Sequence, residues 1–157
     1  MQSAALTSLH YCVLLYRYLR TRDRSALECF LPYLRLLLTA RDKLPKHTGT
    51  VWRGVKDVDM RGNYPKGKEF YWWAFSSTTK ELSVLQATKF LGTKGVRTVF
   101  NIQVNNGIDI EPYSIYQEAE VLMYPGTKLR VKDSMAMGDG LFMVHLEQID
   151  VPVSLFD

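Results

Sequence analysis

Two glutamates separated by one residue, in the segment Glu118-Ala119-Glu120, could together carry out acid–base chemistry. Residues two apart on a β-strand point to the same face, so both carboxylates would enter one site. One carboxylate of such a pair can stabilise positive charge that develops in a transition state, while the other acts as a general base. The plainer alternative is two surface glutamates at the start of a strand. The polar residues upstream bear on this choice.

Arg53 places a charge inside the segment Thr50–Val55, which is otherwise rich in β-branched and aromatic residues and is typical of a strand. Burying a charge without a partner is costly, so this arginine needs one, and a structural salt bridge would serve. A run of hydroxyls follows in Phe75-Ser76-Ser77-Thr78-Thr79. Ser77 could cap a helix that begins near Lys80, a role that Thr79 could equally fill.

Three segments, Val51-Trp52-Arg53-Gly54, Phe75–Thr79 and Glu118–Leu122, occur in an order and at separations that resemble the R-S-E class of mono-ADP-ribosyltransferases. In that family, which includes arginine-specific vertebrate ecto-enzymes and Glu-x-Glu bacterial toxins, the first strand carries an arginine and the second a Ser-Thr-Ser. A later strand opens with Glu-x-Glu. The resemblance covers about residues 44–149, and Thr79 replaces the usual last serine but keeps its hydroxyl. It implies transfer of ADP-ribose from NAD, the co-substrate, with release of nicotinamide.

The resemblance also assigns roles to the two glutamates. Cleavage of the bond between nicotinamide and ribose produces an oxocarbenium-like transition state, so a carboxylate that holds the ribose 2′-hydroxyl can offset the positive charge. We expect Glu120 to do this. We expect Glu118 to orient and deprotonate an acceptor guanidinium, whose pKa in water is too high for an unaided nucleophile. Relatives with glutamate at the first position tend to modify arginine, which predicts an acceptor protein with an exposed arginine.

By the same resemblance, Arg53 would contact an NAD phosphate or the adjoining ribose, which suits the planar guanidinium. The backbone of Gly54 would bind the nicotinamide amide, and Ser77 would hold the catalytic glutamate by a hydrogen bond. Phe90 would lie against the nicotinamide ring, although core packing is an alternative. In the loop before the glutamates, the residues expected to contact the acceptor are Tyr113 and Tyr116; position 115, often aromatic in the family, is isoleucine.

Two other functions fit the same residues. The chain could be an NAD glycohydrolase, in which water replaces the acceptor. It could also be a non-catalytic domain that binds NAD or a protein without turnover. Nucleic acid is not an expected partner, because 20 basic residues against 16 acidic ones give a net charge of only +4 and the basic residues are scattered.

Helices and strands must position these residues, and their expected order in the chain, with helices first and strands last, indicates an α+β fold. Residues 1–46 form the expected helical part. Leu6, Leu9, Val13 and Tyr16 recur at helical spacing, Ser25-Ala26-Leu27-Glu28 fits a capping box that starts a second helix, and Pro32 should bend or split that helix.

Residues 47–157 form the expected β-rich part, which by the resemblance is a mostly antiparallel, two-sheet core packed against the helices. Strands are expected at 50–55, 70–75, 97–104, 120–124, 129–135 and 141–149, with a short helix at 81–91. Asn106-Gly107, Pro125-Gly126 and Gly138-Asp139-Gly140 are turn sequences. The sequence has no Rossmann or P-loop glycine motif, so NAD would bind in another way.

A chain of 157 residues with 46% hydrophobic residues is long enough for one compact domain, which we take to span residues 1–157. His10, His47 and His145 are dispersed and Cys12 and Cys29 have no CxxC spacing, so no metal is expected. The two cysteines could be free thiols or one disulfide. No signal peptide or membrane span is visible. We therefore expect a soluble monomer, cytoplasmic unless the chain has been cut from a longer secreted or anchored protein.

Overall fold

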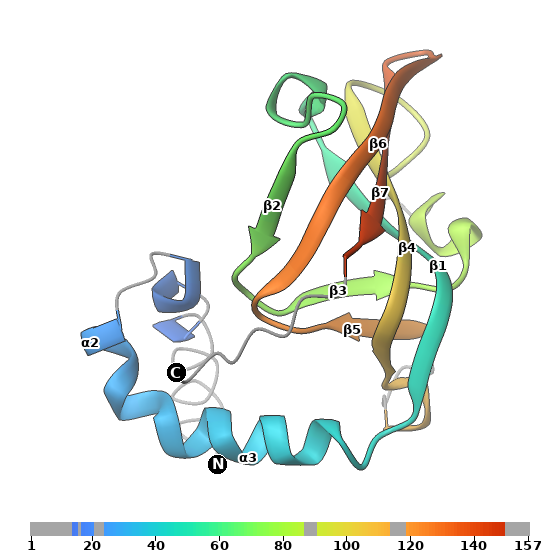
Figure 1. Ribbon diagram of the computed structural model, residues 1–157. Helices are drawn as coiled ribbons and strands as arrows, with labels where there is room; N and C mark the ends of the chain where they lie inside the picture. The colour runs from blue at the N-terminus through green and yellow to red at the C-terminus, as the bar shows by residue number, and fades with distance from the viewer. Residues whose placement is uncertain (1–13, 16, 21–23, 87–90, 114–118, 150–157) are drawn as a thin grey trace, which may run out of the picture.

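The computed structural model describes residues 14–15, 17–20, 24–86, 91–113 and 119–149 (Figure 1). Its helical part includes α2 (Arg24–Leu27), the 3-10 helix η1 (Glu28–Phe30) and α3 (Leu31–Arg41). Pro32 lies in the first turn of α3, where its missing N–H removes no helical hydrogen bond, so the predicted break at Pro32 is confirmed. The capping box at Ser25 is wrong, because Ser25 already lies inside α2, whereas a cap residue must precede the helical backbone.

The first predicted helix lies largely outside the described residues, but residues 14–15 and 17–20 are helical. Buried side chains of the helical part pack together with the residues that precede β3 (Ser76–Thr79). This apolar cluster contains Leu15, Leu19, Phe30, Leu34, Ala74 and Phe75, and Leu122 and Tyr124 pack against it. The Tyr124 hydroxyl also donates a hydrogen bond of 3.3 Å to the carbonyl of Leu37. The helical part thus contacts the ends of the strands that carry the predicted site.

Within the described residues, the β-rich part contains seven strands, which are β1 (Lys46–Lys56), β2 (Glu69–Trp72), β3 (Ser76–Thr79), β4 (Arg97–Asp109), β5 (Glu120–Met123), β6 (Thr127–Gly138) and β7 (Leu141–Gln148). Three short 3-10 helices connect them, η2 (Arg61–Asn63), η3 (Leu82–Gln86) and η4 (Glu111–Tyr113). All strand pairs are antiparallel except β4 with β7, which is parallel. The mostly antiparallel β-rich part is therefore confirmed.

The strands form one hydrogen-bonded sheet, in the order β1-β3-β5-β4-β7-β6-β2 with an additional pairing of β1 and β4, rather than the two sheets that we predicted. The reason is the length of β1 and β4, which reach both groups of strands. β1 pairs with β4 over most of its length and with β3 at Trp52↔Thr79, and the end of β4 pairs with β5 at Ile108↔Leu122. Figure 1 shows the short strands β3 and β5 running across the long ones.

Several element boundaries differ from the prediction. The strand expected at 70–75 ends at Trp72, and the hydroxyl run forms a strand of its own, β3. The predicted helix at 81–91 begins as the 3-10 helix η3, and residues 87–90 lie outside the described residues. The predicted turns at 125–126 and at 138–140 connect β5 to β6 and β6 to β7.

The predicted turn at Asn106-Gly107 is wrong, because β4 continues through it to Asp109. Gly107 pairs with His47 on β1, and a Cβ atom on Gly107 would lie 2.5 Å from Cγ1 of Val121. The glycine therefore allows β4 and β5 to approach closely and does not make a turn. An Asn-Gly pair has the same appearance in a sequence whichever of these two roles it plays.

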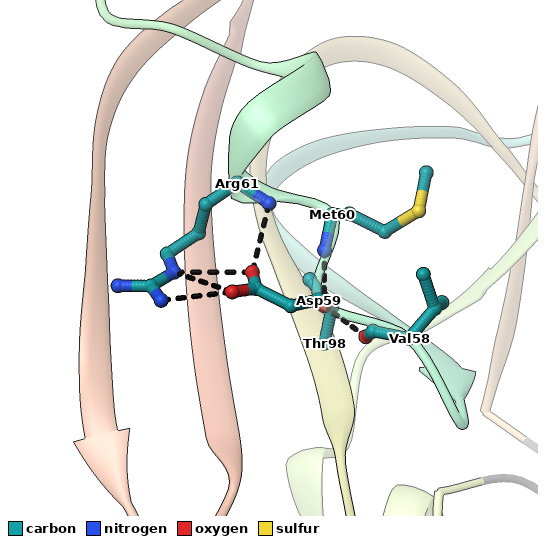
Figure 2. A network of polar contacts seen from close by, with 5 residues as sticks. All are labelled: Val58, Asp59, Met60, Arg61 and Thr98. Atoms are coloured by element: carbon teal, nitrogen blue, oxygen red, sulfur yellow. Dashed lines mark hydrogen bonds and ion pairs between the residues drawn. The ribbon is translucent and has the colours of Figure 1, made fainter.

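The segment that follows β1 is attached to β4 by a compact polar network (Figure 2). The fully buried hydroxyl of Thr98 donates to the carbonyl of Val58 at 2.8 Å and accepts the N–H of Met60 at 3.0 Å. The Asp59 carboxylate accepts hydrogen bonds from the guanidinium of Arg61, which also lies over the Phe142 ring at 4.1 Å from its centroid. These contacts fix the end of β1 that follows Arg53 and Gly54.

The close approach at Gly107 gives a stability prediction. Gly107→Ala should lower the free energy of unfolding by about 1 to 3 kcal/mol, because the added Cβ would overlap the fully buried side chain of Val121 and force it to shift. Chemical denaturation would measure this. Gly62→Ala is the control, since an added Cβ there meets no atom within 4 Å, and its effect should stay within about 0.5 kcal/mol. Equal effects of the two substitutions would contradict the packing argument.

Candidate active site

A cleft with a volume of about 220 Å³ opens where β1, β3, η3 and the start of β5 meet. Its walls include four of the residues selected from the sequence, Arg53, Gly54, Ser77 and Glu120, which are far apart in the chain. The other lining residues are Trp52, Thr78, Thr79, Val84 and Leu85. Sequence reasoning gave Trp52, Val84 and Leu85 no role at a site, because apolar residues at these spacings look the same whether they line a cleft or a core.

Ser77 and Glu120 are brought together by the pairing of β3 with β5. Thr79 lies opposite Glu120 in this pairing, and Ser77 lies two residues before Thr79 on the same face of β3. The Ser77 hydroxyl donates a hydrogen bond to Oε1 of the Glu120 carboxylate. Hydrogen bonds to an ionised acceptor are stronger than neutral ones, so this contact fixes the direction of the carboxylate.

The hydroxyls of Ser77 and Thr79 have separate tasks. Thr79 Oγ1 accepts the backbone N–H of Glu81 at 3.1 Å, just before η3. This is a local contact over two residues before η3, which begins only at Leu82, so Thr79 does not directly precede a helix as a cap residue would. Ser77 lies within β3 and bonds to Glu120, so the alternative in which Ser77 caps a helix is wrong, and the expected hydrogen bond from Ser77 to the glutamate is present.

Arg53 contacts the carbonyl of Ser77 and the ring of Trp72 at the wall of the cleft. Its Nη1 donates a hydrogen bond of 3.0 Å to the backbone carbonyl of Ser77, and its Cζ lies 5.9 Å from the centroid of the Trp72 ring. A carbonyl dipole and an aromatic face can both orient a guanidinium. These two contacts hold the guanidinium in the cleft that Glu120 also lines. The contact with Trp72 was not predicted, since nothing in the sequence distinguishes Trp72 from Trp73 as the ring near Arg53.

Gly54 allows the backbone of β1 to pack closely against Leu91 at the neighbouring wall of the cleft. A Cβ atom at this position would lie 2.9 Å from Cδ1 and 3.1 Å from Cβ of Leu91. Leu91 belongs to a buried cluster with Leu85 and Val99, so any side chain at position 54 would press on this cluster. The backbone of β1 is thus exposed to the cleft at this residue.

Lys80 forms an ion-pair network next to the cleft, with Nζ 2.9 Å from Oδ2 of Asp109 and 2.5 Å from Oε2 of Glu111. Hydrogen bonds to Glu111 and Asp109 raise the pKa of Lys80 above its ordinary value of 10.5. Burial alone would raise the pKa of Asp109, but the hydrogen bonds from Lys80 and from the Glu111 backbone outweigh it and bring this pKa below 3.8.

Both shifts favour the charged forms. The raised pKa of Lys80 stabilises the fold fully below pH 10.5, and this contribution is lost as the pH rises through the folded-state pKa. The lowered pKa of Asp109 stabilises the fold above its ordinary value of 3.8, and this contribution is lost as the pH falls through the folded-state pKa. Lys80 and Asp109 are therefore both charged at neutral pH.

Not every predicted site residue lies at the cleft. Tyr113 lies on η4 with 65% of its surface exposed, and it is not among the cleft-lining residues. Phe90, Tyr116 and Glu118 lie outside the described residues, as does Cys12. Within the described ranges, no group of three or more His, Cys, Asp or Glu side chains could hold a metal ion. In the same part of the chain, no helix is long and apolar enough to cross a membrane.

A serine-held glutamate and an arginine in a cleft of a mostly antiparallel sheet define the ADP-ribosyltransferase class, and comparison with known proteins agrees. The model of the family described as NAD:arginine ADP-ribosyltransferase matches residues 17–151. The chain belongs to this family. NAD is therefore its co-substrate, and the activity is transfer of ADP-ribose from NAD to arginine. No curated protein sequence matches.

Solved structures of bacterial ADP-ribosyltransferases have the same fold. Vis, a toxin from Vibrio splendidus solved in complex with agmatine, is 25% identical with a TM-score of 0.68, over 88% of this chain and 68% of that one. Exoenzyme S from Pseudomonas aeruginosa, solved with human 14-3-3 protein beta and carba-NAD, is 21% identical with a TM-score of 0.63, over 90% and 68%. The corresponding domain of Salmonella SpvB is 17% identical with a TM-score of 0.63, over 88% and 82%.

Proposed function

We propose that residues 1–157 form a single catalytic domain, active as a monomer, in which Glu120 acts on the ribose of NAD and Glu118 on an arginine of an acceptor protein. The observation that carries this proposal is the hydrogen bond from Ser77 to Glu120 in the cleft that Arg53 and Gly54 also line.

In the proposed reaction, the bond between the ribose C1′ and the nicotinamide nitrogen breaks, and its electron pair leaves with the nicotinamide. The ribose becomes oxocarbenium-like, and the Glu120 carboxylate stabilises this charge while it accepts a hydrogen bond from the 2′-hydroxyl. A guanidinium nitrogen of the acceptor then bonds to C1′ and loses a proton to Glu118. Ser77 supports the first step, because a carboxylate that keeps one direction needs no rearrangement when the charge appears.

Arg53 and Gly54 are the proposed binding groups for NAD. The guanidinium of Arg53 would contact a phosphate of the pyrophosphate or the adjoining ribose, since its planar donors match phosphate oxygens. Its anchoring to the Ser77 carbonyl supports this role, because a preoriented cation loses less entropy on binding. The backbone of Gly54 would bind the nicotinamide amide, and Phe90 would lie against the nicotinamide ring.

The proposed acceptor is an exposed arginine of another protein. Tyr113 and Tyr116 would contact that protein, and the 65% exposure of Tyr113 suits such a contact. The structure of the relative Vis was solved with agmatine, a small molecule that carries the same guanidinium group as arginine. This supports a guanidinium acceptor for this chain.

Radiolabelled NAD and agmatine would test the function directly. The unmodified protein should place label on agmatine, and Glu120→Gln should lower both labelling and nicotinamide release by at least about a hundredfold, because the charge that stabilises the transition state is gone. Glu147→Gln is the matched control, a partly buried glutamate paired with Arg130 and Lys132 on another strand, and it should keep full activity. Strong labelling of agmatine by Glu120→Gln would contradict the mechanism. If the unmodified protein releases nicotinamide without labelling agmatine, it is a glycohydrolase. If it forms neither product, it is a domain that binds without turnover.

The division of labour between the two glutamates is tested separately. Glu118→Gln should lose transfer to agmatine by about a hundredfold or more, while hydrolysis of NAD continues. A cationic guanidinium becomes a nucleophile only when it loses a proton, whereas neutral water can attack the oxocarbenium-like ribose without a general base. Chromatography of the products measures the two rates in one reaction. A parallel loss of both activities would mean that Glu118 also acts on NAD, and the assigned roles would then be wrong.

A further inference from the structure

Glu120 is the last residue of one strand pairing and lies one residue beyond the end of another. The pairing of β3 with β5 ends at Thr79↔Glu120, and the pairing of β4 with β5 ends at Asp109↔Val121. Strand ends fray more readily than strand centres, because fewer neighbours hold them. A residue that must keep its carboxylate in one place therefore needs further support beyond these two pairings.

Two backbone hydrogen bonds supply that support, one on each side of Glu120. The N–H of Lys80 donates to the carbonyl of Ala119 at 2.8 Å, and the N–H of Ile110 donates to the carbonyl of Glu120 at 3.1 Å. Lys80 is the first residue after β3, and Ile110 is the first residue after β4. The start of β5 is thus held between the two chain segments that leave these strands.

The side chain of Lys80 joins the same two segments. Its ammonium contacts Asp109 and Glu111, which are the residues on either side of Ile110. Asp109 Oδ1 also accepts the N–H of Glu111 at 3.1 Å, which fixes the Asp109 carboxylate relative to the backbone on the far side of Ile110. Only 25% of the Lys80 side chain and 22% of the Asp109 side chain are exposed, so solvent screens this pair less than a surface pair.

We propose that Lys80 is a positioning residue for Glu120, with its ion pairs to Asp109 and Glu111 holding together the two backbone donors on either side of the catalytic carboxylate. This inference rests on the proposed function of Glu120. Lys80 is not among the residues that line the cleft, so we expect its substitution to leave the NAD contacts in place. Its substitution therefore acts through the position of Glu120, and small errors in the position of a catalytic group reduce turnover strongly.

The test compares three variants of the full chain. Lys80→Met removes the charge with little change in length, and Lys80→Arg keeps the charge and its hydrogen bonds. Lys132→Met is the matched control, because Lys132 also forms an ion pair, 3.1 Å from Glu147, but lies on β6. The unmodified protein and Glu120→Gln are assayed beside them with NAD and agmatine.

For Lys80→Met, kcat should fall about tenfold for both transfer and hydrolysis, because both need Glu120 in place. The KM for NAD should change by less than about twofold, since the NAD contacts remain. Lys80→Arg should recover at least about half of the lost kcat, and Lys132→Met should match the unmodified protein. A purely structural role would lower Tm well below that of Lys132→Met and would not separate kcat from KM in this way.

Amide hydrogen exchange at Ile110 gives a second readout that needs no activity. In Lys80→Met, the Ile110 N–H should exchange at least about tenfold faster than in Lys132→Met, because the donor to the Glu120 carbonyl is no longer held. Unchanged exchange, or unchanged kcat in a protein whose Glu120→Gln variant is inactive, would overturn the inference about Lys80 alone. No NAD turnover by the unmodified protein would refute the proposed function instead, and exchange at Ile110 would then decide by itself whether Lys80 holds Glu120.

Discussion

The hydrogen bond from the Ser77 hydroxyl to the Glu120 carboxylate depends on one strand register, in which Thr79 lies opposite Glu120. A shift of one residue in this pairing would turn Ser77 to the other face of β3 and leave the carboxylate without its donor. Much of the surrounding structure keeps the register. The buried side chain of Val121 packs into the space left by Gly107, and the Thr78 hydroxyl donates to the carbonyl of Val121 at 2.6 Å.

The same constraint explains how charge is arranged around the cleft. Arg53 is oriented by the carbonyl of Ser77, the residue whose side chain orients Glu120, so β3 sets the positions of the positive and the negative group together. An anionic dinucleotide and a cationic transition state need both groups, at different points of one ligand. Lys80 continues this arrangement beyond the end of β3, where its backbone and side chain reach the segments on both sides of Glu120.

The sequence predicted the catalytic and binding residues of the site better than it predicted the residues that position them. Arg53, Ser77 and Glu120 were recognised because charged and hydroxyl side chains in strand-like segments are unusual and occur in a known order. Lys80 was not recognised, since a lysine after a strand has the same appearance whether it is solvated or paired, and its partners are about thirty residues away along the chain. The Asn106-Gly107 turn was predicted wrongly for a related reason, because close contact with Val121 is a tertiary effect that local turn preferences do not contain. The single sheet also depends on long-range pairing, through β1 and β4.

The most direct test of the account is the rate of NAD cleavage when the Ser77 hydroxyl alone is removed. In Ser77→Ala, kcat at saturating NAD should fall by about tenfold to a hundredfold, as expected for loss of a hydrogen bond to a charged group that is worth roughly 1.5 to 3 kcal/mol. Ser76→Ala is the control, because Ser76 lies on the opposite face of β3, and it should retain the full rate. Cleavage of NAD by Ser77→Ala at the rate of Ser76→Ala would contradict the claim that Ser77 holds Glu120 for catalysis.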